Sequence, residues 1–218
     1  MTERKKKLIT LSVVMGIVVM VAAGSTIAYF TDTKDATNTF EMGDVEIKLD
    51  ETDIDNPDSR TEEGNNYSDL APGQVVTKDP IIYNTGSKDA YVRAKVTVKD
   101  WVSECAKYFP DAPAYGEADY KNTLSLLIGS DDNATGLESG WSIESAKKND
   151  AGDVTFTLKY DGTLASGKQT TIFQQVQIPE RMENDESFGD IVITGQAIQT
   201  QGFDSWEEAF AAFDEADD

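Results

Sequence analysis

The segment AYVRAKVTV at residues 90–98 restricts the fold of this chain more than any other feature of its sequence. Its small and branched apolar side chains occupy one set of alternate positions, namely Ala90, Val92, Ala94, Val96 and Val98. The positions between them carry Tyr91, Arg93, Lys95, Thr97 and then Lys99. Because successive side chains of a strand point to opposite faces, this pattern predicts a half-buried strand with a water-facing second side.

Shorter runs with the same period precede and follow this strand, and turn residues separate them. They fall at 45–49, 75–83, 124–128, 141–143, 154–160, 170–179 and 190–201, and the run at 75–83 passes through Pro80. We expect a short helix or an irregular connection at 101–122. About eight strands in one domain are typical of two packed antiparallel sheets, so we predict an all-β, jelly-roll-like β-sandwich.

The C-terminal segment DSWEEAFAAFDE has a different period. Trp206, Ala209, Phe210 and Phe213 follow the i, i+3, i+4, i+7 spacing of a helix, and Ser205 with Glu208 forms a capping box. We predict an amphipathic helix at 204–214 whose apolar stripe packs on the sandwich. A stripe that binds a partner is the alternative.

The N-terminus has the pattern of an export signal. A basic cluster at residues 4–7 precedes an apolar run at 8–23, and small residues follow. Ala28 and Tyr29 flank the preferred cleavage position, with a second possible cut after Ser25. We therefore divide the chain into a signal peptide at 1–28, an N-terminal arm at 29–40 and a sandwich domain at 41–218. An uncleaved transmembrane anchor is the alternative, and both interpretations place the domain outside the cell.

Composition excludes several kinds of chemistry. The chain has no histidine and one cysteine, so a Ser-His-Asp triad, a Cys-His pair and a histidine-based zinc site are all absent. The formal charge is −21, from 19 basic and 40 acidic residues. Loss of Glu3 and the four basic residues at 4–7 leaves 15 basic and 39 acidic residues, a charge of −24. Such a surface repels nucleic acid, so no nucleic-acid partner is expected.

The remaining candidate sites are weak. An acidic loop near residues 50–58 carries Asp53, Asp55 and Asp58 as possible Ca²⁺ ligands, but it lacks the EF-hand spacing, and a solvated loop is the simpler interpretation. We otherwise expect no cofactor and no catalytic residue. Cys105 resembles a small buried hydrophobe more than a nucleophile. A lysine beside Asn or Asp can form an isopeptide crosslink, as in some Gram-positive surface proteins, but the sequence alone singles out no such group.

Two stretches carry a family resemblance. GSTIAYFTDTKDATNTFEMGDVEIKLDE and LAPGQVVTKDPIIYNTGSKDAYVRAKVTV resemble the TasA and camelysin (CalY) family of Gram-positive bacteria, nearest to its BsaA-like clostridial biofilm-matrix members. The ending AIQTQGFDSWEEAF is also similar to family members. Such proteins are exported with a SipW-type signal peptidase. The resemblance implies a secreted jelly-roll subunit of biofilm-matrix fibres at the cell surface.

In that family, the segment freed by signal cleavage inserts as a donor strand into the next subunit. Here the resemblance assigns this role to the arm, with Tyr29, Phe30, Ala36 and Phe40 as its apolar anchors. An arm without a role, or one that pairs within its own sheet, is the alternative. We expect a non-enzymatic homopolymer, and related matrix subunits are further candidate partners. The rival interpretations are a camelysin-like metallopeptidase, a label that the absence of histidine opposes, and a monomeric surface-binding module held by an uncleaved helix.

Overall fold

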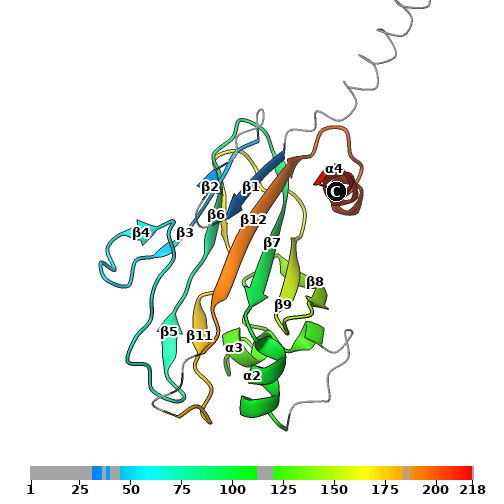
Figure 1. Ribbon diagram of the computed structural model, residues 1–218. Helices are drawn as coiled ribbons and strands as arrows, with labels where there is room; N and C mark the ends of the chain where they lie inside the picture. Colours follow the sequence, from blue (N-terminus) through cyan, green and yellow to red (C-terminus); the bar gives the residue numbers. More distant parts are fainter. Residues whose placement is uncertain are drawn as a thin grey trace, which may run out of the picture.

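A computed structural model describes residues 31–35, 38–39, 45–111, 120–183, 186 and 188–217. The largest sheet has six strands, all antiparallel to their neighbours, in the order β2-β1-β12-β7-β9-β8 (Figure 1). In that order the strands are Asn38–Thr39, Thr31–Asp35, Ile191–Gln199, Ala90–Val98, Val154–Tyr160 and Trp141–Lys148. The long strand predicted at 90–98 is therefore β7, at the centre of this sheet.

A second sheet of four strands has the order β10-β6-β3-β4. Its strands are Gln169–Thr171, Ile81–Asn84, Ile47–Thr52 and Arg60–Thr61. A two-stranded ribbon pairs β5, Val75–Thr77, with β11, Gln175–Gln177. The predicted run at 75–83 is thus divided between two sheets, as is the run at 170–179. The breaks face each other, because Lys78 donates its N–H to the Gln174 carbonyl and Ile172 donates to Pro80. Pro80 has no N–H of its own to continue a ladder.

The two larger sheets pack face to face. Ile47 and Ile82 from one sheet and Val96, Phe156 and Leu158 from the other are all fully buried in one apolar core. The contact is closest at β12, where a Cβ on Gly195 would lie 3.3 Å from the side chains of both Ile47 and Ile82. The fold is therefore mostly β with antiparallel sheets, as predicted. The jelly-roll connectivity stays a prediction.

Helices close one end of the core. The expected helix after β7 is α2, Trp101–Tyr108, which buries Trp101 and Cys105. The strand predicted at 124–128 is wrong, because this segment forms a short helix, α3 at Ser125–Ile128, which follows a 3-10 turn, η1 at Tyr120–Asn122. Leu124, Leu127 and Ile128 are buried there, which is a helical spacing. A run this short matches both periods, and the packing against the core selects the helix.

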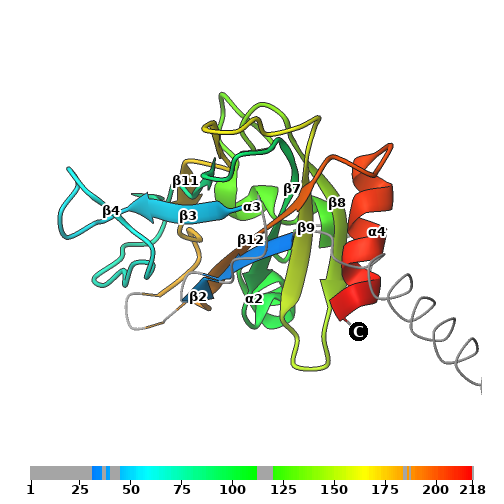
Figure 2. The same ribbon diagram turned by 90° about the horizontal axis from the view of Figure 1, so that it is seen from above.

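The predicted C-terminal helix is α4, Trp206–Asp217. Ser205 accepts a hydrogen bond from the Glu208 N–H at 3.2 Å, and Glu208 accepts one from the Asp204 N–H at 2.8 Å. The apolar stripe packs with Ile198, as expected. Figure 2 shows α4 and β3 on opposite sides of the six-stranded sheet.

The position of α4 corrects the prediction of a water-facing side on β7. Arg93 lies on that side but is only 3% exposed. Its guanidinium pairs with Asp214 and donates to Gln196, and it stacks 4.4 Å from the Phe210 ring centre. The alternation at 90–98 shows that one face is apolar, but it cannot show that a distant helix covers part of the other.

Among the residues that the structure describes, none of the helices combines the length and the apolar character needed to cross a bilayer.

Candidate assembly site

The strand β12 has a different partner along each edge. On one edge β7 pairs with all of its residues, from Ile191 to Gln199. On the other edge β1 pairs only from Thr194 to Ile198, with Asp35 opposite Thr194 and Thr31 opposite Ile198. The chain then pairs back on β1 through β2, with Lys34 opposite Thr39. The predicted N-terminal arm therefore supplies an edge strand to its own sheet.

Part of the β12 edge is left open by this arrangement. In the described part of the chain, no strand pairs with residues 191–193 on the β1 side. Val192 lies in this stretch and is 42% exposed, which is unusual for a valine within a long strand of the main sheet. Unpaired N–H and C=O groups on an edge are a template for another extended chain. We call residues 191–193 the open edge.

A groove of about 860 Å³ lies beside the open edge. It runs between the end of β3 and the start of β12, and the loop after β4 forms its rim. Its apolar wall consists of Leu49, Leu70, Val76, Val176, Ile178, Met182, Phe188, Ile191 and Ile193. A groove with apolar walls beside an unpaired edge is suited to an extended segment with alternate apolar side chains.

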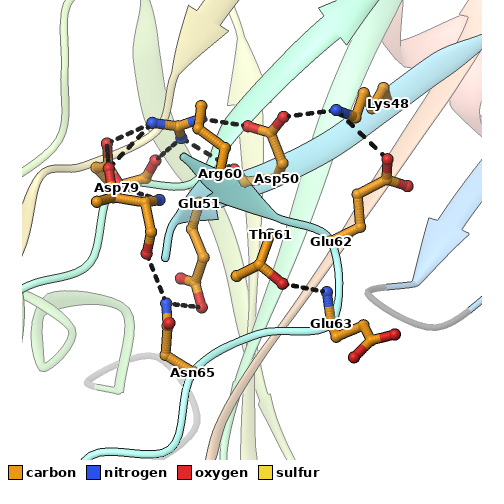
Figure 3. Close-up of polar contacts among 10 residues, drawn as sticks. Lys48, Asp50, Glu51, Arg60, Thr61, Glu62, Glu63, Asn65 and Asp79 are labelled. Atoms are coloured by element: carbon orange, nitrogen blue, oxygen red, sulfur yellow. Dashed lines mark hydrogen bonds and ion pairs between the residues drawn. The ribbon is translucent and has the colours of Figure 1, made fainter. Parts of the chain in front are cut away.

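An ion-pair network fixes the hairpin that carries one wall of the groove (Figure 3). Arg60 of β4 contacts Asp50 of β3 at 2.5 Å and Asp79 at 2.8 Å, and it also donates to both of their main-chain carbonyls. Asp50 accepts a further contact from Lys48 at 2.9 Å. Burial acts to raise the pKa of the Asp79 carboxyl, but hydrogen bonds from Arg60 and Thr52 hold it below its usual value. The hairpin is thus tied to the β5–β6 connection.

A separate polar group lies on the opposite side of the same strand end. Glu51 is 5% exposed and accepts from Lys78 Nζ at 2.8 Å. Its other oxygen accepts from Asn65 Nδ2 at 3.0 Å (Figure 3). Asp50 and Glu51 are neighbours in a strand, so their side chains point to opposite faces and serve two separate groups.

A third ion pair lies near the far end of the groove. Hydrogen bonds from Lys107 and then Tyr108, whose hydroxyl lies 2.7 Å from Glu186 Oε2, lower the pKa of Glu186 to about 2. This carboxylate stays charged over the whole physiological pH range.

Most of the predicted site residues lie outside the described part of the chain. This applies to Ala28 and Tyr29 at the cleavage position and to the other arm anchors, Phe30, Ala36 and Phe40. Their roles stay predictions. What the structure describes of the arm is the backbone of β1 and β2, and it matches the alternative in which the arm pairs within its own sheet.

The candidate calcium ligands have a local explanation. Asp53 Oδ1 accepts hydrogen bonds from the N–H groups of Asp55 at 2.9 Å and Asn56 at 3.2 Å, which is the pattern of an Asx turn. Asp55 and Asp58 are exposed. Across the described ranges, no three His, Cys, Asp or Glu side chains are grouped so that they could hold a metal ion. Cys105 is fully buried, as expected for a core residue.

No pattern in the sequence singles out Arg60, Asn65, Lys78 or Asp79. The one available signal was that two adjacent acids, Asp50 and Glu51, end the apolar alternation at 45–49. Because neighbouring strand residues point to opposite faces, two acids in succession cannot both face solvent on a half-buried strand. Their partners come from separate loops, which no periodicity predicts.

Comparison with known proteins gives one match. The family model described as camelysin metallo-endopeptidase matches residues 3–107. No curated protein and no solved structure matches the chain. The residues described here do not fit a peptidase metal centre, since the chain has no histidine and the described ranges hold no suitable ligand group. The match does include the apolar run at residues 8–23, β1 and the β3–β7 region. Over residues 3–107, just under half of its length, this chain is therefore similar to the camelysin metallo-endopeptidase family.

Proposed function

We propose that this protein is a secreted structural subunit of extracellular biofilm-matrix fibres. In this proposal, subunits polymerise head-to-tail, and the N-terminal arm freed by signal cleavage inserts as a donor strand into the next subunit. The observation that carries the proposal is the pairing of β1 with only part of the β12 edge, beside an apolar groove.

The arm of a neighbouring copy can replace β1 and make the same ladder hydrogen bonds to β12. Thr31–Asp35 pairs with residues 194–198 in a regular antiparallel register. A second copy offers the same sequence to the same edge, so each ladder hydrogen bond lost within a subunit is regained between subunits. Exchange of an identical element is a low-cost route to association.

An inserted arm gains contacts if it stays extended. Continuing the β1 register would place Ala36, Thr37 and Asn38 opposite Ile193, Val192 and Ile191, where the described chain has no partner. Directly opposed residues share a face, so Ala36 would point into the groove with Ile193. Four positions after Ala36, Phe40 would share this face and lie opposite Gly189, the residue that follows Phe188. This register gives the anchors Ala36 and Phe40 a place to pack.

The energetic gain lies mainly in the aromatic anchor. An extended arm loses the two pairs between β1 and β2 and gains three pairs at the open edge. Cross-strand pairs contribute about 0.2–1 kcal/mol each, so this exchange is almost neutral. Burial of a phenylalanine contributes about 1.5–3 kcal/mol. The extended arm is therefore favoured over the folded-back arm by about 1.5–3 kcal/mol, and further contacts between subunits must offset the cost of association, about 4–15 kcal/mol.

Such an assembly grows as an open filament. The donor end and the acceptor groove are different surfaces, so each added subunit presents a new acceptor unless the rotation closes a ring. Before cleavage by a SipW-type peptidase, the arm is continuous with the apolar leader at residues 8–28 and is not free to insert. Signal cleavage would then start assembly.

The direct test compares mature protein that begins at Tyr29 with protein that begins at residue 41, by negative-stain electron microscopy. We expect fibres from the first and none from the second. A synthetic peptide of residues 29–40 should bind the shortened protein and also stop growth of the mature form. The same peptide with Phe40→Ser is the matched control and should bind more weakly. Fibres from the shortened protein would refute the proposal.

We also propose that the role is structural and not catalytic, despite the peptidase name of the family. Purified mature protein should leave casein intact with or without added Zn²⁺. Chelator-sensitive cleavage that copurifies with the chain would favour the peptidase alternative. An intact Met1 in extracellular protein, measured by mass spectrometry, would favour the anchored surface module.

A further inference from the structure

Glu51, Asn65 and Lys78 belong to the lining of the groove and meet there in an arrangement that strand insertion does not require. Lys78 and Glu51 are both buried, with side chains 10% and 7% exposed. Glu51 Oε2 lies 2.8 Å from Lys78 Nζ, and Glu51 Oε1 lies 3.0 Å from Asn65 Nδ2. One carboxylate thus holds an amine and a carboxamide side by side. From this geometry we propose that Lys78 and Asn65 form an intramolecular isopeptide bond, with Glu51 as the general acid and base.

The carboxamide is held at both of its polar atoms. Asn65 Oδ1 accepts a hydrogen bond from the Ile54 N–H at 3.0 Å. Asn65 Nδ2 donates to the Thr52 carbonyl at 2.8 Å as well as to Glu51. The side chain therefore has a fixed orientation, and its Nδ2 binds one oxygen of the carboxylate whose other oxygen binds the Lys78 amine. Fixed orientation of two reacting groups removes much of the entropic barrier to their reaction.

Each atom has a task in the reaction. Glu51 Oε2 takes a proton from the Lys78 ammonium, whose nitrogen lies 2.8 Å away. The neutral amine attacks Cγ of Asn65, and the negative charge that develops on Oδ1 is met by the Ile54 N–H, as in an oxyanion hole. Glu51 Oε1 is already hydrogen-bonded to Nδ2, the nitrogen that must be protonated in order to leave.

The atoms and charges balance without a further reactant. A bond forms between Lys78 Nζ and Asn65 Cγ, and the bond between Cγ and Nδ2 breaks. The amine gives up one proton to the departing nitrogen by way of Glu51, and ammonia leaves. Ammonia then takes the proton still held by Glu51, so the products are a secondary amide, an ammonium ion and the original carboxylate. No oxidant, reductant or metal takes part.

The second polar group on β3 provides a comparison within the molecule. Arg60 is bound to Asp50 and Asp79 in a similar ion-pair arrangement at the other face of the strand. It has no carboxamide on its carboxylates, and a guanidinium does not act as an acyl acceptor. The Glu51 group differs by having both reactants, which a purely structural ion pair does not need.

The test is the mass of the intact mature protein and of one tryptic peptide. Asn65 and Lys78 both lie between the cleavage points after Arg60 and after Lys88. With the bond formed, the protein is lighter by one ammonia molecule, and trypsin yields peptide 61–88 uncut at Lys78. Full sequence mass after overnight incubation at neutral pH would overturn the proposal. So would ammonia loss with normal cleavage at Lys78, because that result indicates a succinimide.

Three variants distinguish formation of the Lys78–Asn65 amide bond from noncovalent contact between the same side chains. Lys78→Arg keeps the ion pair with Glu51 but cannot form the amide, and Glu51→Gln keeps the shape but cannot carry a proton. Both should fold, by circular dichroism, and have full mass. Lys107→Arg, which alters an exposed ion pair with Glu186, is the matched control and should retain the ammonia loss. Mass is measured on monomeric protein, so the outcome does not depend on fibre formation.

Discussion

Both ends of the described chain pack on β12, but they are held in different ways. The N-terminal strand β1 is joined to β12 by a ladder of five opposed residue pairs. The C-terminal helix α4 is held by buried side chains, including Trp206, Phe210 and Phe213, and by Arg93 beneath it. A backbone ladder can be rebuilt with any identical strand, whereas interlocked aromatic side chains are specific to one partner surface. The proposed strand exchange uses this difference, since it requires an N-terminus that can leave its own sheet while the C-terminus stays in place.

The largest expected effect comes from locking β1 in place. Asp35 and Thr194 are directly opposed, so the double variant Asp35→Cys, Thr194→Cys can form a cross-strand disulfide. When oxidised before assembly, we expect it to stay monomeric, because its arm cannot leave. A reductant should restore fibres to the wild-type level, as judged by electron microscopy.

The same variant also reports on the fibre itself. If it is assembled under reducing conditions and then oxidised, the disulfides should join neighbouring subunits and give a ladder of covalent oligomers in a denaturing gel. The single variant Thr194→Cys should give none. Bands of monomer alone from oxidised fibres would mean that β1 does not exchange.

The next largest effect concerns stability and not assembly. Trp206 is 7% exposed, and its indole N–H donates to the Val92 carbonyl at 2.8 Å. Trp206→Ala should lower the free energy of unfolding by about 3–5 kcal/mol, as for other buried tryptophans. Urea denaturation of the arm-deleted protein, with and without Trp206→Ala, measures this loss. The Trp206→Ala variant that keeps its arm should still form fibres from its folded fraction. Glu207→Ala, which removes an exposed pair with Lys159, should cost less than about 1 kcal/mol.

The contrast between the chain ends also explains what the sequence could predict. The helix was predictable because its stripe of Trp206, Ala209, Phe210 and Phe213 records the packing in a local pattern. The strand β1 has the sequence TDTKD, which contains no apolar residue to indicate a buried face. Its place on β12 depends on residues more than 150 positions away, and backbone pairing leaves no trace in such a sequence.

The candidate sites show the same limit. Leu49 and Ile193 of the groove fall on predicted strands, so much of its wall was foreseeable. Glu51, Asn65 and Lys78 are a strand residue and two loop residues whose meeting depends on loop geometry. The buried Arg93 was missed for a related reason, since a polar residue at an outward position gives no sign of the helix above it.

A smaller effect should follow from the pair between Arg93 and Asp214. The hydrogen bond from Arg93 lowers the pKa of Asp214 below its usual value. A carboxyl with a lowered folded pKa stabilises the protein above its unfolded pKa, near 3.9, and this contribution is lost as the pH falls through the folded pKa. Asp214 is more than half exposed, so we expect a loss of at most about 1 kcal/mol in Asp214→Asn at pH 7.

Urea midpoints of arm-deleted protein at pH 7 and in acid provide the measurement. The gap between wild type and Asp214→Asn should close in acid, because both side chains are then uncharged. A gap that stays constant with pH would show that the helix depends on its apolar contacts alone and gains nothing from this ion pair.

The smallest effect, on the rate of assembly, arises from charge at the acceptor. Subunits cleaved after Ala28 would each carry a net charge of −24, and the groove rim includes Glu63 and Asp190, which are both exposed. Repulsion between exposed charges is screened by salt, with a Debye length of about 10 Å at 0.1 M and about 3 Å at 1 M. Polymerisation, followed by turbidity, should therefore speed up with NaCl or Ca²⁺, or as the pH falls.

Two double variants that change the net charge equally test whether the position of the charge matters. Glu63→Gln with Asp190→Asn neutralises two acids at the groove rim, and Glu208→Gln with Glu215→Gln neutralises two acids on α4. At low salt, the groove-rim variant should polymerise faster than the α4 variant. The two variants should converge at high salt. Equal rates at low salt would mean that total charge, and not the acceptor groove, controls the approach of subunits.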